Sequence, residues 1–348
     1  MDSLLAVSLT LPHKNNRISS FVCFTYLKWY IKTVFTIRNG VFKLAKYIIK
    51  RLLLAILTVF IVATLTFFLM NAVPGGPYEA EKSISPTAKA ALEAKFGLDQ
   101  PLFKQYLTYM KNILHGDFGP SLKQRGRNVI DIIMTKFPVS AKVGGISVLM
   151  ALIVGIPLGC ISALNRGKVS DSSIIVIATI GIAVPSFVVC SLSMYIFGVK
   201  LRWLPTVGLT TWKNYVMPVF ALSFYPTAYI TRLMRSSMLD VLGQDYMRTA
   251  RAKGVSQFFS LFKHALRNAI LPIVTYVGPM MAYTLTGSFI IEKVFTIPGL
   301  GGEFVSSITN RDYMMIMGTT IFLATLMVFM TFVVDIVYKI IDPRINLK

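Results

Sequence analysis

The sequence predicts an all-α polytopic membrane protein with six transmembrane helices. Of the 348 residues, 54% are hydrophobic, and the mean hydropathy is +0.63. A soluble globular domain does not need so much apolar surface. Six uncharged runs are each near the roughly 20 residues that a helix needs to cross a bilayer core. These runs are residues 52–70, 143–165, 172–199, 214–231, 268–291 and 313–334.

The formal net charge of +21 is explained by basic residues that flank these runs. Such an excess in a soluble protein would suggest a nucleic-acid partner, but no basic cluster here belongs to a recognisable nucleic-acid fold. We therefore expect a lipid bilayer as the surroundings and no nucleic acid as a partner. Cys23, Cys160 and Cys190 have no metal-ligand spacing, so neither a metal site nor a disulfide framework is expected.

Basic residues also orient the chain. They precede the first run, separate the second from the third, and dominate the loop between the fourth and fifth, which predicts that these three segments are cytoplasmic. The residues are Lys43, Lys46, Lys50 and Arg51, then Arg166 and Lys168, then the loop 232–267. Both termini are then cytoplasmic, in a multi-pass protein of the cell membrane. On the outer side, Lys200, Arg202 and Lys213 weaken this bias without reversing it.

The first apolar run is preceded by an N-terminal extension and followed by a large loop. Residues 1–45 are expected to be an N-terminal extension, because the stretch 21–37 is aromatic and apolar but is interrupted by Lys28 and Lys32. An interfacial helix suits this pattern, and no small-residue cleavage site follows it. Residues 46–348 form the expected transmembrane domain. Within it, residues 71–136 are predicted to form a large external loop that opens with a proline- and glycine-rich turn.

The cytoplasmic loop 232–267 contains the clearest candidate site. If residues 244–253 form one helix, Tyr246, Ala250 and Gly254 lie on one side. Arg248 and Arg251 point roughly opposite, and Lys253 precedes the glycine. Gly254 would end the helix in a left-handed conformation, and Ser256 would cap a second helix. This helix–turn–helix would insert into a pocket on another protein. Alternatively, it is a basic amphipathic loop that rests on anionic lipid.

The loop sequence RTARAKG, followed by HALRNAILP, resembles the EAA loop of binding-protein-dependent ABC importer permeases of the oligopeptide and dipeptide type. Arg248 and Thr249 stand where the general family pattern has Glu and Ala. Leu271-Pro272 follows the glycine five residues later than in that pattern. The resemblance implies the type I importer permease fold and a coupling helix that docks on a separate ATPase.

Further strings resemble the same family in the same order. They are FGLDQP at 96–101, GDFGPS at 116–121, EKVFTIPGLGGEF at 292–304, RDY at 311–313 and DPRI at 342–345. In the third string, Glu292, Pro298, Gly299 and Gly301 would build a tight external turn. This turn either touches a docked binding protein or caps the helix bundle.

The sequence offers no catalytic centre. It has no phosphate-cradling G-x-x-x-x-G-K-[ST] motif, and its three histidines are scattered. We therefore expect no enzyme activity and no cofactor in this chain, with ATP bound by a partner subunit. No ionisable residue lies deep in a predicted span, whereas proton- or sodium-coupled carriers usually need one.

These observations favour a permease subunit that forms half of a translocation pathway. The resemblance implies a second homologous permease, two ATP-binding subunits, an extracellular solute-binding protein and a peptide substrate. Three alternatives stay open. The same type of permease could import nickel or another small solute, or the chain could be a secondary carrier or channel, or a structural membrane scaffold.

Overall fold

The computed structural model describes residues 48–73, 86–124, 126–256, 259–285 and 289–341. The expected N-terminal extension and the DPRI string lie outside the described residues. The chain divides into two units, the second of which is Leu57–Asn346. All contacts discussed below lie within the second unit.

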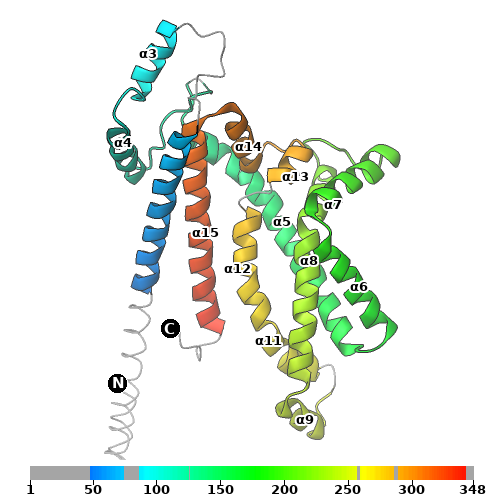
Figure 1. Ribbon diagram of the computed structural model, residues 1–348. Coiled ribbons are helices and arrows are strands. Elements are labelled where there is room, and N and C mark those ends of the chain that lie inside the picture. Colours follow the sequence, from blue (N-terminus) through cyan, green and yellow to red (C-terminus); the bar gives the residue numbers. More distant parts are fainter. Residues whose placement is uncertain (1–47, 74–85, 125, 257–258, 286–288, 342–348) are drawn as a thin grey trace, which may run out of the picture. The chain divides into compact units, whose positions relative to one another are not determined.

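The described residues are mainly helical and contain no β-strand (Figure 1). A first long helix spans Ile48–Ala72. The others are α3 (Pro86–Phe96), α4 (Leu102–Leu114), α5 (Val129–Leu164), α6 (Val169–Ala183), α7 (Ser186–Ser193), η1 (Met194–Lys200), α8 (Lys213–Leu242), α9 (Asp245–Ala252), η2 (Ser260–Ala265), α11 (Leu266–Ala269), α12 (Leu271–Leu285), α13 (Phe289–Val294), α14 (Leu300–Asn310) and α15 (Tyr313–Ile341).

Most expected spans coincide with long apolar helices. Four helices in the described ranges are long and apolar enough to cross a membrane, namely Ile48–Ala72, Val129–Leu164, Leu271–Val294 and Tyr313–Ile336. A bent pair of helices, Val169–Ala183 and Ser186–Lys200, could supply a fifth crossing. The expected fourth span lies in α8, which is long enough at 30 residues but includes charged residues at both ends. The all-α membrane class is thus confirmed.

The third expected span, 172–199, is not one straight helix. It bends by 101° between α6 and α7. Pro185 causes the break, since proline removes a helical donor and disfavours helical backbone at the preceding residue. Val184 accordingly has extended backbone, with φ −82° and ψ 122°. The second span also differs from expectation, because α5 begins at Val129, so the last eight residues of the expected loop 71–136 are helical.

Helices α5 and α8 form the central pair of the bundle. A Cβ added to Gly155 would lie 2.9 Å from Cγ2 of Ile230, and one added to Gly159 would lie 2.5 Å from Cβ of Met234. A step of four residues along α5, from Gly155 to Gly159, corresponds to a step of four residues along α8, from Ile230 to Met234. The two helices therefore run in the same direction. The G-x-x-x-G sequence of α5 therefore permits close approach of two backbones, as small residues do in membrane bundles.

Many large apolar side chains on the long helices face outward. On the first helix Leu53 is 63% exposed, and on α5 Ile153 is 70% exposed. Water would penalise this arrangement, whereas hydrocarbon would not. The buried core, by contrast, is rich in methionine and small residues, including Ala151, Met234 and Met280. The distribution is that of a protein whose surroundings are apolar.

Candidate functional site

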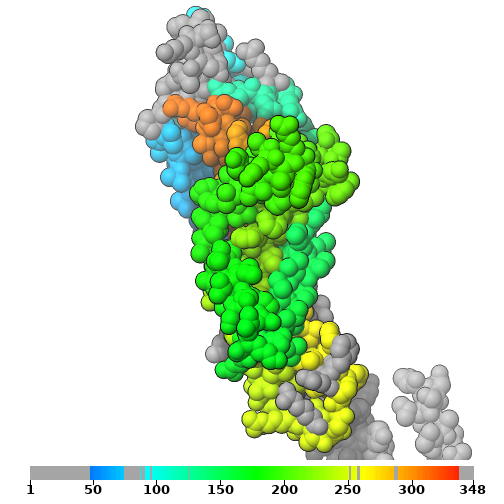
Figure 2. All heavy atoms as spheres, turned by 90° about the vertical axis from the view of Figure 1, so that its right-hand side faces the viewer, coloured from blue at the N-terminus to red at the C-terminus, as the bar shows by residue number. Residues whose placement is uncertain are grey.

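Helix α9 lies beyond the end of α8 that is remote from Lys213, past the last turn of α5 and the start of α6 (Figures 1 and 2). Met247 anchors it, with only 1% of its surface exposed. The Met247 side chain joins the core cluster that contains Met238 of α8 and Ala265 and Ala269 of the following segment. A short polar helix is thereby held firmly by one apolar residue.

Gly254 ends this helix as the sequence predicts. Its φ is +74°, in the left-handed region, and the Val255 N–H donates to the Ala250 carbonyl over 3.2 Å. A bond of this span is the signature of a Schellman C-cap, which turns the chain sharply while satisfying a carbonyl at the helix end. Nothing lies within 4 Å of a Cβ built at Gly254, so glycine is required there by the backbone and not by lack of space.

The second helix of the loop is present, but its first part is a π-helix and not an α-helix. The Ser256 hydroxyl accepts a bond from the Phe259 N–H at 3.4 Å, which agrees with the predicted cap. The chain then forms the π-helical turn η2 before the four residues of α11. The Ser237 hydroxyl of α8 donates to the Ala269 carbonyl at 2.8 Å and ties this return segment to the bundle.

The predicted coupling residues occupy different sides of α9. Arg248 is exposed, 3.7 Å from the Asp245 carboxylate across one helical turn. Ala250 is half-buried, and the Tyr246 hydroxyl accepts a bond from the Asn268 amide at 2.9 Å. The side with Tyr246 and Ala250 is thus turned partly toward its own chain.

Lys253 is exposed beside Gly254. Arg251 lies on α9, and its side chain is not among those that the structure describes. The exposed residues among the described side chains of α9 are Asp245, Tyr246, Arg248, Thr249 and Ala252. Sequence analysis missed the anchor Met247. Its signal was present as the single large aliphatic residue among the polar residues of the helix.

A partly buried ion pair braces the same end of the bundle. Arg235 of α8 donates through Nε and Nη2 to both carboxylate oxygens of Asp171, at 2.7 and 2.8 Å. Asp171 also accepts bonds from the Ser162 hydroxyl at 2.6 Å and the Gly167 N–H at 3.0 Å. Bidentate pairs of this kind fix orientation as well as distance. They join α5, α6 and α8 close to the point from which the loop departs.

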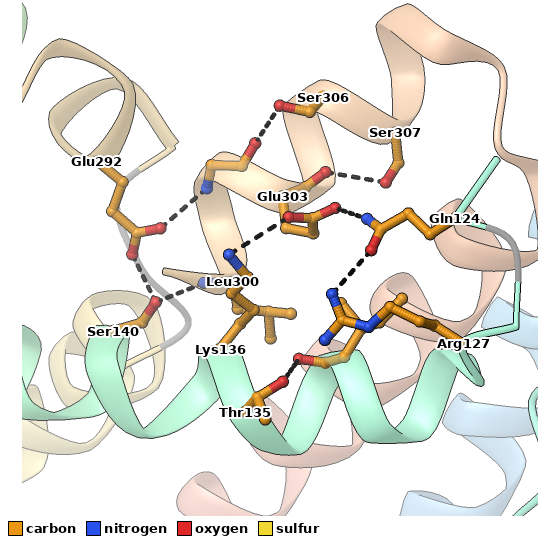
Figure 3. Close-up of polar contacts among 12 residues, drawn as sticks. Gln124, Arg127, Thr135, Lys136, Ser140, Glu292, Leu300, Glu303, Ser306 and Ser307 are labelled. Atoms are coloured by element: carbon orange, nitrogen blue, oxygen red, sulfur yellow. Dashed lines mark hydrogen bonds and ion pairs between the residues drawn. The ribbon is translucent and has the colours of Figure 1, made fainter. Parts of the chain in front are cut away.

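At the opposite end of the bundle, Glu292 is buried, with 3% of its surface exposed (Figure 3). Its carboxyl oxygens accept bonds from the Ser140 hydroxyl at 2.6 Å and the Gly302 N–H at 2.9 Å. The Leu300 N–H donates in turn to Ser140 Oγ. Gly299 and Gly301 are buried beside this carboxyl group, and only Pro298 of the four candidate residues is exposed. The burial of Glu292 favours the second of the two roles, a cap on the bundle.

A second polar contact joins two of the family-like strings. Asp312 of the RDY string accepts bonds from the Ser121 hydroxyl and from the Leu122 N–H at 3.2 Å. Ser121 ends the string GDFGPS. Asp312 is 2% exposed, so its carboxylate organises the loop before α5 in a place shielded from water. Neither residue had a predicted role.

A cavity of about 550 Å³ opens at the α6–α7 bend against α8 and α12. Pro185 and Pro226 lie in its wall, together with Tyr225, Tyr276 and Tyr283. The Tyr229 and Tyr276 rings approach with centroids 4.3 Å apart. The wall is therefore mostly apolar with a few hydroxyl groups, as small-molecule sites in proteins commonly are.

A bundle of apolar helices, an open cavity among them and one polar helix–turn–helix at the end are together the features of a membrane transport subunit. The chain belongs to the family of inner membrane components of binding-protein-dependent transport systems. The family model with that description matches residues 155–347, and the model for the N-terminal part of such components matches residues 44–144. The chain is the permease subunit of an ABC importer.

The matches to curated relatives extend over nearly the full length of each relative. The chain is 44% identical over 304 residues to the dipeptide transport system permease protein DppB of Bacillus subtilis, with 87% of this chain and 99% of the relative covered. It is 42% identical over 303 residues to the oligopeptide transport system permease protein OppB of Haemophilus influenzae, with 86% and 99% covered. A solved methionine ABC transporter, MetNI, shows 15% identity and a TM-score of 0.49, covering 61% of this chain and 97% of that chain.

Proposed function

We propose that this permease carries dipeptides or oligopeptides and forms half of the pathway beside a second homologous permease. The names of the relatives at 42–44% identity support the substrate class. A pathway that passes many peptides needs hydrogen-bonding groups that do not select particular side chains. The tyrosine hydroxyl groups of the 550 Å³ cavity meet this need. An extracellular solute-binding protein delivers the peptide.

The coupling role rests on one observation, the protruding α9 ended by the left-handed Gly254. Helix α9 docks on one of two separate ATP-binding subunits, and the residues that carry this contact are Tyr246, Arg248, Ala250, Arg251, Lys253 and Gly254. Met247 transmits the movement of the docked ATP-binding subunit to α8, because Met247 is packed in the core beside Met238. This chain holds no ATP itself.

Uptake by cells with and without the gene tests the substrate class. We expect labelled di- and oligopeptides to accumulate only in cells with an intact copy, and we expect Ni²⁺ uptake to be the same in both strains. Loss of Ni²⁺ uptake with unchanged peptide uptake would assign the chain to the nickel-importing alternative. Peptide uptake that persists after ATP depletion with the ion gradients intact would indicate a secondary carrier.

We further propose that both termini and α9 are cytoplasmic, while α4 is outside. In a chain whose native cysteines are replaced by alanine, an impermeant thiol reagent should label His115→Cys in intact cells. It should label Arg248→Cys only after the membrane is permeabilised. Both positions are exposed, so a difference reports the side of the membrane and not burial. The opposite pattern would contradict the proposed orientation.

A further inference from the structure

A groove between α5, η1 and α8 lies at the end of the bundle remote from α9. It has a volume of about 530 Å³. Its lining is apolar and aromatic, and it includes Ile146 and Met150 of α5, Phe197 of η1 and Val216 and Phe220 of α8. The groove is separate from the tyrosine-lined cavity, since the two have no lining residue in common.

Two tryptophans stand at the groove with their side chains largely in the open. Trp203 is 66% exposed and Trp212 is 73% exposed, and both line the groove. Tryptophan is enriched at the level of lipid headgroups, where its ring is partly apolar and its N–H remains accessible to polar groups. The mouth of the groove therefore lies at the depth of the headgroups.

Two lysines stand at this mouth. Lys142 Nζ lies 5.0 Å from the ring centroid of Tyr215, and Lys213 Nζ lies 6.0 Å from that of Trp212. Both rings belong to the lining. The two lysines are exposed, and neither forms an ion pair with an acidic residue of the described part of the chain. Their charge is available to an external anion.

The sequence around the groove contains several basic residues and no acidic residue that would neutralise them. Between Asp171 and Asp240 there is no acidic residue, while Lys200, Arg202 and Lys213 all lie near this end of the bundle. These are the same residues that oppose the positive-inside bias. A positive cluster on the outer side is unfavourable for orientation. An anionic partner at the groove supplies a physical reason for it.

We propose that this groove binds an anionic phospholipid, with the headgroup phosphate between Lys142 and Lys213 and the acyl chain along the apolar lining. On α5, Lys142, Ile146 and Met150 follow one another at intervals of four residues, so charge gives way to apolar surface over two turns. On α8 the same change occurs from Lys213 to Val216 and Phe220. The rise along α5 from Lys142 to Met150 is about 12 Å, which suits the upper part of an acyl chain.

Retention of phosphatidylglycerol by the purified transporter complex tests the proposal. Native mass spectrometry would count lipids after extraction from membranes that contain phosphatidylglycerol and phosphatidylcholine. The double variant Lys142→Gln, Lys213→Gln should lower retained phosphatidylglycerol roughly tenfold, because two headgroup contacts are removed. Val216→Trp should lower it through filling of the groove, with the lysines intact. Phosphatidylcholine should change little in the lysine variant.

A matched control removes the same charge on the same side. Lys104→Gln, Lys111→Gln alters two exposed lysines of α4, a helix that contributes no residue to the groove, and retention should stay at the wild-type level. Equal retention by both double variants would overturn the proposal. So would a Val216→Trp complex that keeps its phosphatidylglycerol but loses the second permease, since the groove would then be a subunit interface. Transport is not the readout, so the result does not depend on the proposed substrate.

Discussion

Replacement of Gly254 by leucine should leave the chain in the membrane and abolish most of its transport. The φ of +74° is a conformation that a residue with a Cβ adopts at a cost of about 1–2 kcal/mol. That cost shifts the population of the sharp turn by about tenfold, which displaces the open end of α9. The transmembrane helices are held by other contacts, so membrane insertion should be near normal. Peptide uptake and the amount of ATPase that copurifies would be measured.

Two variants separate backbone strain from bulk. Gly243, at the end of α8 in the same loop, is also exposed but has an ordinary φ of −78°, so Gly243→Leu should retain transport. Gly254→Asn should be milder than Gly254→Leu, because asparagine tolerates the left-handed region. If Gly254→Leu transports normally with the ATPase attached, α9 is not the coupling element. The loop would then be one that rests on lipid.

Replacement of Gly299 by alanine should destabilise the whole permease. A Cβ at this position would lie 2.5 Å from the Ser140 hydroxyl oxygen and would overlap the Glu292 carboxyl group. Glu292 is buried and holds its neighbours through several hydrogen bonds, so displacing it leaves polar groups unsatisfied at a cost of about 2–4 kcal/mol. We expect less protein in the membrane and a lower thermal unfolding temperature in detergent.

Gly302→Ala is the matched control for this effect. It lies three residues away in the same turn, and its added Cβ would meet nothing closer than the Ile297 carbonyl at 3.5 Å. That separation is an ordinary contact, so stability should change little. Equal stability of the two alanine variants would show that the Glu292 contacts do not hold the cap. A fully stable Gly299→Ala chain that loses transport would instead support contact with a docked binding protein.

Local sequence predicted much of the cytoplasmic loop 232–267. The short helix, the left-handed Gly254 and the serine that follows are encoded by residues a few positions apart, and their geometry depends on local backbone rules. The anchor Met247 could have been identified from the pattern of α9 alone. The partners of Met247 could not, because its packing against Met238, Ala265 and Ala269 is set by the tertiary structure.

The bend in the third span shows a limit of a different kind. Hydropathy identified one apolar run over 172–199, and Pro185 within this run disfavours a continuous helix. The angle of 101° depends on what α7 and η1 pack against. Two neighbours of α7 are α8 and α13, which come later in the chain. A run of apolar residues reports that a segment avoids water, but it does not report the direction of that segment.

The sequence by itself determined the class of protein, the apolar helices, the polar loop and the relation to importer permeases, because each depends on composition or on short motifs. Only the tertiary structure decided how those motifs meet. Ser121 and Asp312 are 191 residues apart, and Ser140 and Leu300 are 160 apart, yet each pair is joined by a buried hydrogen bond. Such pairs leave no local pattern. They are set by the folding of the helices, which brings distant polar groups together where water cannot satisfy them.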